Sequence, residues 1–135
     1  MDNKELITLA LKARENSYSP YSGCRVGAAL LAESGRVYTG CNIENAAFGP
    51  TVCAERVAVF KAVSEGEKRF VKIAVAGGRN DLPDDYFYPC GVCRQVLSEF
   101  CADGFEIITA VSPEKYFTET LDGMLPHRFG PEKVK

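Results

Sequence analysis

Two short cysteine motifs, each at the start of a predicted helix, restrict the folds open to this chain more than any other feature. The first is Cys53-Ala54-Glu55, and the second is Pro89-Cys90-Gly91-Val92-Cys93. Residues 52–65 carry apolar residues at helical spacing, and residues 91–100 form a second helical pattern. We therefore expect a fold in which two helix N-termini, each with a partial positive charge, converge on one place.

The rest of the chain alternates between strand and helix patterns. Asp2 or Asn3 can cap a first helix, which a turn at residues 19–23 ends. Strands are predicted at residues 26–31, 36–40, 71–76 and 105–111, a loop at 80–89, and short helical segments at 112–117 and 119–125. An opening hairpin followed by alternating helices and strands indicates an α/β sandwich with a mixed sheet, in one domain over residues 1–135.

Composition and charge argue against several classes of protein. The formal net charge is −2, so we expect no nucleic-acid partner, because polyanion binders concentrate Lys and Arg on one face. The N-terminus lacks the apolar core of a signal peptide, and no apolar run approaches the ~18 residues that span a membrane. We predict a cytoplasmic protein, whose six cysteines are metal ligands or small buried residues, as expected for Cys41 and Cys101.

The second cysteine motif alone is ambiguous. A Cys-x-x-Cys at a helix start also describes a thioredoxin-like dithiol or half of a structural four-cysteine zinc site. The first motif favours catalysis, because a His or Cys, one residue and then Glu, followed downstream by Pro-Cys-x-x-Cys, is the signature of zinc deaminases. We predict that Cys53, Cys90 and Cys93 hold one Zn²⁺ per chain and leave its fourth position for water.

Glu55 and Arg56 follow the first cysteine and extend this prediction. Zinc lowers the pKa of its water, so that hydroxide can attack the ring carbon that carries the amino group while Glu55 shuttles protons. The alternative for Glu55 is a solvated carboxylate that favours the helix dipole. Three thiolates leave the zinc site with a net charge of about −1. We expect Arg56 to draw negative charge from the sulfurs, although a surface ion pair is the other reading.

At this point the chain resembles the small homotetrameric cytidine deaminases, almost from end to end. The matching motifs are Pro20-Tyr21-Ser22, Val26-Gly27-Ala28-Ala29, residues 40–46, Cys53-Ala54-Glu55-Arg56, residues 89–95 and the tail at 125–131. The resemblance implies a three-layer α/β/α sandwich with a mixed five-stranded sheet. It also implies zinc-dependent hydrolysis of cytidine and deoxycytidine to uridine and deoxyuridine in pyrimidine salvage. The expected assembly is a homotetramer with active sites at the subunit interfaces.

The resemblance also assigns substrate-binding residues. It places Asn42 and Glu44 at the ribose hydroxyls, and the backbone of Ala54 at the pyrimidine carbonyl. Phe129 matches a C-terminal phenylalanine that closes the pocket of a neighbouring subunit. Its other reading is an anchor that holds the tail in its own core, and both roles are compatible.

Three positions depart from the family pattern around the expected pocket. Cys24 stands where a phenylalanine usually stacks near the pyrimidine, Phe48 where tyrosine is common, and Tyr88 where a small hydroxyl residue is frequent. Another cytosine nucleoside, such as the antibiotic blasticidin S, is therefore an alternative substrate. A polynucleotide editor is disfavoured because no basic or aromatic-rich extension is present. A redox or structural zinc module leaves Glu55, Asn42 and Glu44 without a role.

Overall fold

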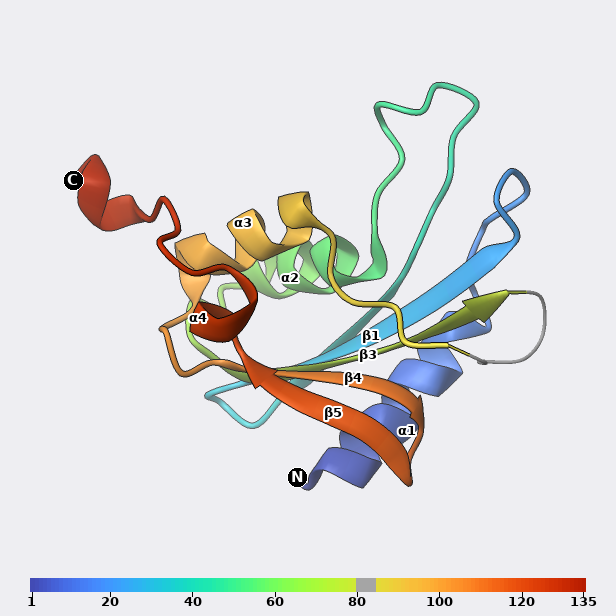
Figure 1. Cartoon of the computed structure of the whole chain (residues 1–135), viewed down its shortest axis with the longest axis horizontal. Coiled ribbons are helices and arrows are strands. Elements are labelled where there is room, and N and C mark those ends of the chain that lie inside the picture. Colours follow the sequence, from blue (N-terminus) through green and yellow to red (C-terminus); the bar gives the residue numbers. More distant parts are fainter. Residues whose placement is uncertain (80–84) are drawn as a thin grey trace.

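The computed structural model describes residues 1–79 and 85–135, and it is built around one five-stranded sheet (Figure 1). The strands are β1 (Cys24–Ala32), β2 (Val37–Cys41), β3 (Phe70–Arg79), β4 (Glu106–Ser112) and β5 (Lys115–Thr120). They lie in the order β2-β1-β3-β4-β5, and β3 and β4 run parallel while the other neighbours run antiparallel. The sheet is therefore mixed, as the sequence predicted.

Helices cover both faces of this sheet. Helix α1 (Asn3–Arg14) lies on one face, while α2 (Ala54–Ser64) and α3 (Gly91–Phe100) lie side by side on the other (Figure 1). The short helix α4 (Leu121–Met124) contacts α3, and a 3₁₀ turn occupies Pro131–Lys133. This arrangement confirms the predicted α/β/α sandwich. None of the helices in the described ranges combines the length and apolarity that crossing a membrane requires.

Alternating side chains of the central strands fill two separate cores. In β1, Ala28 and Leu30 pack toward α2 and α3, whereas Ala29 packs toward α1. In β4, Ile107 and Ile108 divide between the two cores in the same way. Because successive strand residues point to opposite faces, a strand that is covered on both sides must be apolar at nearly every position. The continuous apolar runs of the sequence follow from this.

Two glycines bring the helices close to the sheet. A Cβ on Gly27 would lie 2.0 Å from the carbonyl oxygen of Ala10 in α1. A Cβ on Gly40 would lie 2.6 Å from the carbonyl oxygen of Ala54 in the first turn of α2. Any side chain at these positions would push a helix away from the strands. Gly40 therefore helps to set the position of the helix that begins after Cys53.

One predicted segment is wrong, and another is only partly described. Residues 112–117 were expected to be helical, but Ser112 ends β4, and the chain turns directly into β5 at Lys115. Pairing along β4 stabilises this Tyr-, Phe- and Thr-containing segment as an edge strand. Residues 80–84 of the predicted loop at 80–89 lie outside the described residues. The predicted cap is confirmed, because the Asp2 carboxylate accepts a hydrogen bond from the Glu5 amide at 2.8 Å.

Candidate active site

The three predicted cysteine ligands meet where α2 and α3 begin. Cys53 is the N-cap residue of α2, Cys90 is the N-cap residue of α3, and Cys93 lies in the first turn of α3. Their three sulfur atoms all lie within 4.8 Å of one another, and the sulfurs of Cys53 and Cys90 are 3.7 Å apart. Two segments far apart in the sequence thus form one cluster able to hold a metal ion.

The chemistry of this cluster fits a zinc ion. All six cysteines are free, so these three sulfurs are available as thiolate ligands. A hydrogen bond from the Cys93 thiol, aided by Arg56 and Cys90, lowers the pKa of Cys53 to about 5. The same contact and burial raise the pKa of Cys93. The guanidinium Nη2 of Arg56 lies 3.5 Å from the sulfur of Cys53, which is the position that the sequence predicted for charge compensation.

Glu55 lies in the first turn of α2, two residues after Cys53, and only 4% of its surface is exposed. Burial raises the pKa of its carboxyl group to about 7. The alternative reading, a carboxylate in solvent at a helix start, does not agree with this burial. A buried carboxyl group whose pKa lies near neutrality can both accept and donate a proton.

A pocket of about 340 Å³ connects the cysteine cluster with the predicted substrate residues. Pockets that bind small molecules typically have volumes of about 300–1,000 Å³, and this pocket falls within that range. The residues that line it are Ser22, Cys24, Val26, Asn42, Glu44, Thr51, Val52, Cys53, Ala54, Glu55, Phe87, Tyr88 and Cys90. The structure thus brings Asn42, Glu44, Ala54 and Glu55 to one cavity beside two of the three thiols.

Asn42 and Glu44 are both held in place by their own chain. The Asn42 side chain donates to the Cys24 carbonyl at 2.7 Å, and it accepts from the Val26 amide at 2.9 Å. The Glu44 carboxylate accepts from the Tyr21 and Ser22 amides and from the Ser22 hydroxyl. The Ser22 hydroxyl and these backbone bonds lower the pKa of Glu44. Both polar groups are therefore fixed at the wall of the pocket.

Phe129 is the one predicted substrate-binding residue that the chain does not bring to this pocket. It is 60% exposed and is absent from the residues that line the cavity. Its backbone carbonyl accepts a hydrogen bond of 2.6 Å from the side chain of Gln95 in α3. The reading of Phe129 as a core anchor does not hold in a single chain, because its ring remains exposed.

Reasoning from the sequence missed several contributors to the pocket wall, among them Ser22 and Phe87. Ser22 was read as part of a turn, although its hydroxyl connects Glu44 with the Cys24 amide, which donates to it at 3.0 Å. Phe87 packs against Gly77, where a Cβ would lie 2.8 Å from the ring. The motif Pro20-Tyr21-Ser22 could have pointed to Ser22. The place of Phe87 follows only from its packing against Gly77 in the folded chain.

The cysteines outside the cluster and the positions that depart from the family pattern have distinct surroundings. Cys24 lines the pocket, as does Tyr88, while Phe48 is 77% exposed and pairs edge-on with Tyr21. Cys41 and Cys101 are half-buried rather than fully buried, and burial raises the pKa of Cys101 to about 12. The prediction of two buried cysteines is therefore met only in part, because Cys101 packs against the core while both residues stay half-buried.

A thiol cluster beside a buried glutamate, at paired helix N-termini on a mixed sheet, defines a hydrolase of the metal-binding deaminase class. Comparison with known proteins agrees with this class. The family model described as "Cytidine and deoxycytidylate deaminase zinc-binding region" matches residues 1–109. The chain belongs to this family, and it is accordingly a hydrolytic deaminase.

Individual relatives match over the whole length of the chain. The cytidine deaminase of Sporosarcina psychrophila is 45% identical over 134 residues, which cover 99% of this chain and 96% of that protein. The cytidine deaminase of Halalkalibacterium halodurans is 44% identical, with 99% and 98% covered. The crystal structure of cytidine deaminase from Burkholderia pseudomallei superposes with a TM-score of 0.87 at 38% identity, covering 96% of this chain and all of that one (100%).

Proposed function

We propose that this protein deaminates cytidine and deoxycytidine, with one water consumed and one ammonia released for each uridine or deoxyuridine formed. This reaction belongs to pyrimidine salvage. The observation that carries the proposal is that the buried Glu55 and two of the clustered thiols line the same pocket. Identity of 44–45% with two cytidine deaminases over 99% of the chain supports the choice of substrate.

In this proposal Cys53, Cys90 and Cys93 hold one Zn²⁺ per chain. When bound, the ion lowers the pKa of a water molecule so that it can attack carbon C4 of the pyrimidine near neutral pH. Arg56 donates toward the sulfur of Cys53, and the N-termini of α2 and α3 add partial positive charge. These positive groups offset the excess negative charge of three thiolates.

Glu55 moves the protons of the reaction. Its carboxylate accepts a proton from the attacking water and delivers a proton to ring nitrogen N3. It then carries the second proton of that water, released from the new hydroxyl on C4 as the carbonyl forms, to the amino group, which leaves as ammonia. The burial of Glu55 supports this role, because a carboxyl group shielded from bulk water exchanges protons with the substrate rather than with solvent.

Asn42, Glu44 and the backbone amide of Ala54 orient the nucleoside in our proposal. A carboxylate offers about four acceptor sites, and Glu44 uses three of them for Tyr21 and Ser22. The free site can accept a hydrogen bond from a ribose hydroxyl without moving the side chain. The Ala54 amide lies at the start of α2 and can donate to the pyrimidine carbonyl.

The central test compares Glu55→Gln with the unchanged protein. The unchanged protein should contain about one zinc per chain and convert cytidine to uridine, seen as a change in ultraviolet absorbance. Glu55→Gln should keep its zinc and lose activity by about 10²–10⁴-fold, because the amide cannot carry the proton. Full activity in that variant would contradict the mechanism.

Glu65→Gln is the matched control. Glu65 is an exposed glutamate at the C-terminal end of the same helix, so its replacement should leave both zinc content and turnover unchanged. A redox module would behave differently, because its thiols would cycle with a dithiol reductant and Glu55 would be dispensable. Parallel assays with deoxycytidine, substituted cytosines and blasticidin S identify the preferred substrate.

A further inference from the structure

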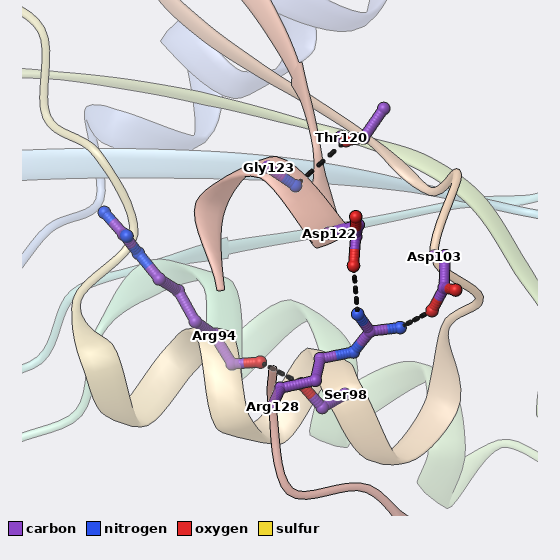
Figure 2. A network of polar contacts seen from close by, with 7 residues as sticks. All are labelled: Arg94, Ser98, Asp103, Thr120, Asp122, Gly123 and Arg128. Atoms are coloured by element: carbon purple, nitrogen blue, oxygen red, sulfur yellow. Dashed lines mark hydrogen bonds and ion pairs between the residues drawn. The ribbon is translucent and has the colours of Figure 1, made fainter. Parts of the chain in front are cut away.

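Arg94 is a half-buried cation whose role the reaction does not explain. It follows Cys93 in α3, and its guanidinium bonds two backbone carbonyls from different parts of the chain. Nε donates to the Pro89 carbonyl at 2.7 Å, and Nη1 donates to the Met124 carbonyl at 2.6 Å. In Figure 2 its side chain points away from the ion pairs of Arg128, so the two arginines act at different places.

The first contact bears directly on a metal ligand. Pro89 is fully buried, and its carbonyl belongs to the peptide unit that joins it to Cys90. Because a peptide unit is planar, fixing its oxygen also fixes the nitrogen and the Cα of Cys90, so that the Cys90 side chain can change direction only by rotation about φ and χ1. Cys90 is exposed, and its side chain makes no capping hydrogen bond to α3. Arg94 thus supplies a constraint that Cys90 does not supply itself.

The second contact joins Arg94 to helix α4, which is itself held in place by other bonds. Met124 ends α4, and this helix is capped by Thr120, whose hydroxyl accepts from the Gly123 amide at 3.0 Å (Figure 2). Arg128, from the segment after α4, pairs with Asp122 in α4 and with Asp103 in the loop before β4. Arg128 therefore ties the C-terminal segment to the loop before β4, while Arg94 bonds α4 separately at the Met124 carbonyl.

We propose that Arg94 is a positioning residue for the metal centre. By bonding the carbonyls of Pro89 and Met124, it ties the backbone that leads into Cys90 to helix α4. This inference rests on the proposed zinc site. A guanidinium can span two carbonyls because its nitrogen donors form a rigid planar fork. A lysine at this position offers one ammonium group, and a glutamine offers a shorter amide, so neither can reproduce both bonds.

Zinc retention tests the role separately from catalysis. Zinc-loaded protein is mixed with an excess of a chromophoric chelator, and the release rate is followed by absorbance. Arg94→Gln should release zinc about 10–100-fold faster than the unchanged protein, because groups that orient metal ligands typically contribute that much to affinity. Arg94→Lys should fall between the two, since it keeps one charge-assisted hydrogen bond.

Arg128→Gln is the matched control, because it also loses a guanidinium but none of the contacts to Pro89 or Met124. Its zinc release should stay within about twofold of the unchanged protein. Equal release rates for Arg94→Gln and the unchanged protein would overturn the inference while leaving the zinc site intact. If the unchanged protein holds no zinc, the proposed metal centre fails, and this inference fails with it.

A general loss of stability is distinguished by a spectroscopic readout. Cobalt(II) bound by three thiolates absorbs through sulfur-to-metal charge transfer, and the intensity reports how many sulfurs bind. Cobalt-loaded Arg94→Gln should show weaker charge-transfer absorption than Arg128→Gln, measured under conditions in which both variants are folded by circular dichroism. Equal intensity with faster release in both variants would assign the effect to folding and contradict the positioning role.

Discussion

Glu55 and Arg56 are adjacent in the sequence, yet their side chains have different surroundings. The Glu55 carboxyl group is buried at the pocket, and the Arg56 guanidinium reaches the sulfur of Cys53. The Nε of Arg56 is buried, and it finds no hydrogen-bond partner among the residues that the structure describes. Arg56 forms no ion pair with a carboxylate within the ranges that the structure describes, so the competing reading, a surface ion pair, has no partner there. The charge of Arg56 is therefore directed at the thiolates.

Cys24 is the residue on which the choice of substrate most depends. It lines the pocket where the family pattern has a stacking phenylalanine. Cys24→Phe should lower the KM for cytidine about fivefold or more, because stacking of a base on an aromatic ring contributes roughly 1–3 kcal/mol. Steady-state kinetics with cytidine measure this change, and kcat should change less than KM.

The control for that substitution is Cys24→Ala, which removes the thiol without adding a ring and should leave KM nearly unchanged. A KM that stays constant or rises in Cys24→Phe contradicts the prediction. It would mean that Phe87 or Tyr88, which line the same pocket, already occupies the space beside the base. The antibiotic and the substituted cytosines would then be the substrates to compare first.

At the scale of elements, helix α2 carries both a metal ligand and the proton shuttle of the proposed reaction. Its distance from the sheet depends on Gly40 in β2. A Cβ at this position would meet the Ala54 carbonyl oxygen at 2.6 Å and the Ala58 amide nitrogen at 2.7 Å. Both atoms belong to the helix backbone, so a side chain at Gly40 would have to displace the helix itself.

Gly40→Ala should therefore lower stability and weaken zinc binding together. Overpacking of this kind costs about 1–3 kcal/mol, which urea denaturation measures as a lower midpoint. The same preparation should release zinc faster to a chelator. Gly104→Ala is the control, because a Cβ there meets nothing within 4 Å. Unchanged stability in Gly40→Ala would show that α2 can move outward without cost.

The order of elements was largely predictable from local patterns. The helix predicted at 91–100 coincides with α3, and the other strand and helix bounds differ by a few residues. The exception is β5, where exposed residues alternate poorly and only pairing with β4 selects the strand. Local periodicity cannot reveal such an edge strand, because its partner lies across a turn and its outer face has no core to cover.

At the scale of the whole molecule, the exposed ring of Phe129 is the feature that one chain leaves without a role. The segment that carries it is held against α3 by the bond from Gln95, away from the pocket of the same chain. We propose that Phe129 closes the pocket of a neighbouring subunit in a homotetramer. An exposed aromatic side chain on an anchored segment suits such a contact, because little flexibility is lost on docking.

Mixed oligomers test this proposal. Phe129→Ala should raise the KM for cytidine about tenfold or more, since loss of a central aromatic contact costs about 2 kcal/mol. Co-expression with Glu55→Gln should restore activity, because some pockets then combine an intact Glu55 with an intact Phe129 from the partner chain. Activity no greater than the sum of the two separate variants would place Phe129 outside the neighbouring pocket.

The sequence by itself determined the deaminase class and most of the order of elements, with β5 as the exception. Spaced cysteines, a glutamate two residues after the first, and two helical patterns are local features, and local features are written directly in the chain. Tertiary structure alone decided which groups are buried and which meet. Glu55 is buried, Arg56 contacts the sulfur of Cys53 in the same helical turn, and Arg94 links Pro89 to Met124, which lies 30 residues further along the chain than Arg94. Burial and long-range hydrogen bonds belong to the packed fold, and no spacing in a sequence encodes them locally.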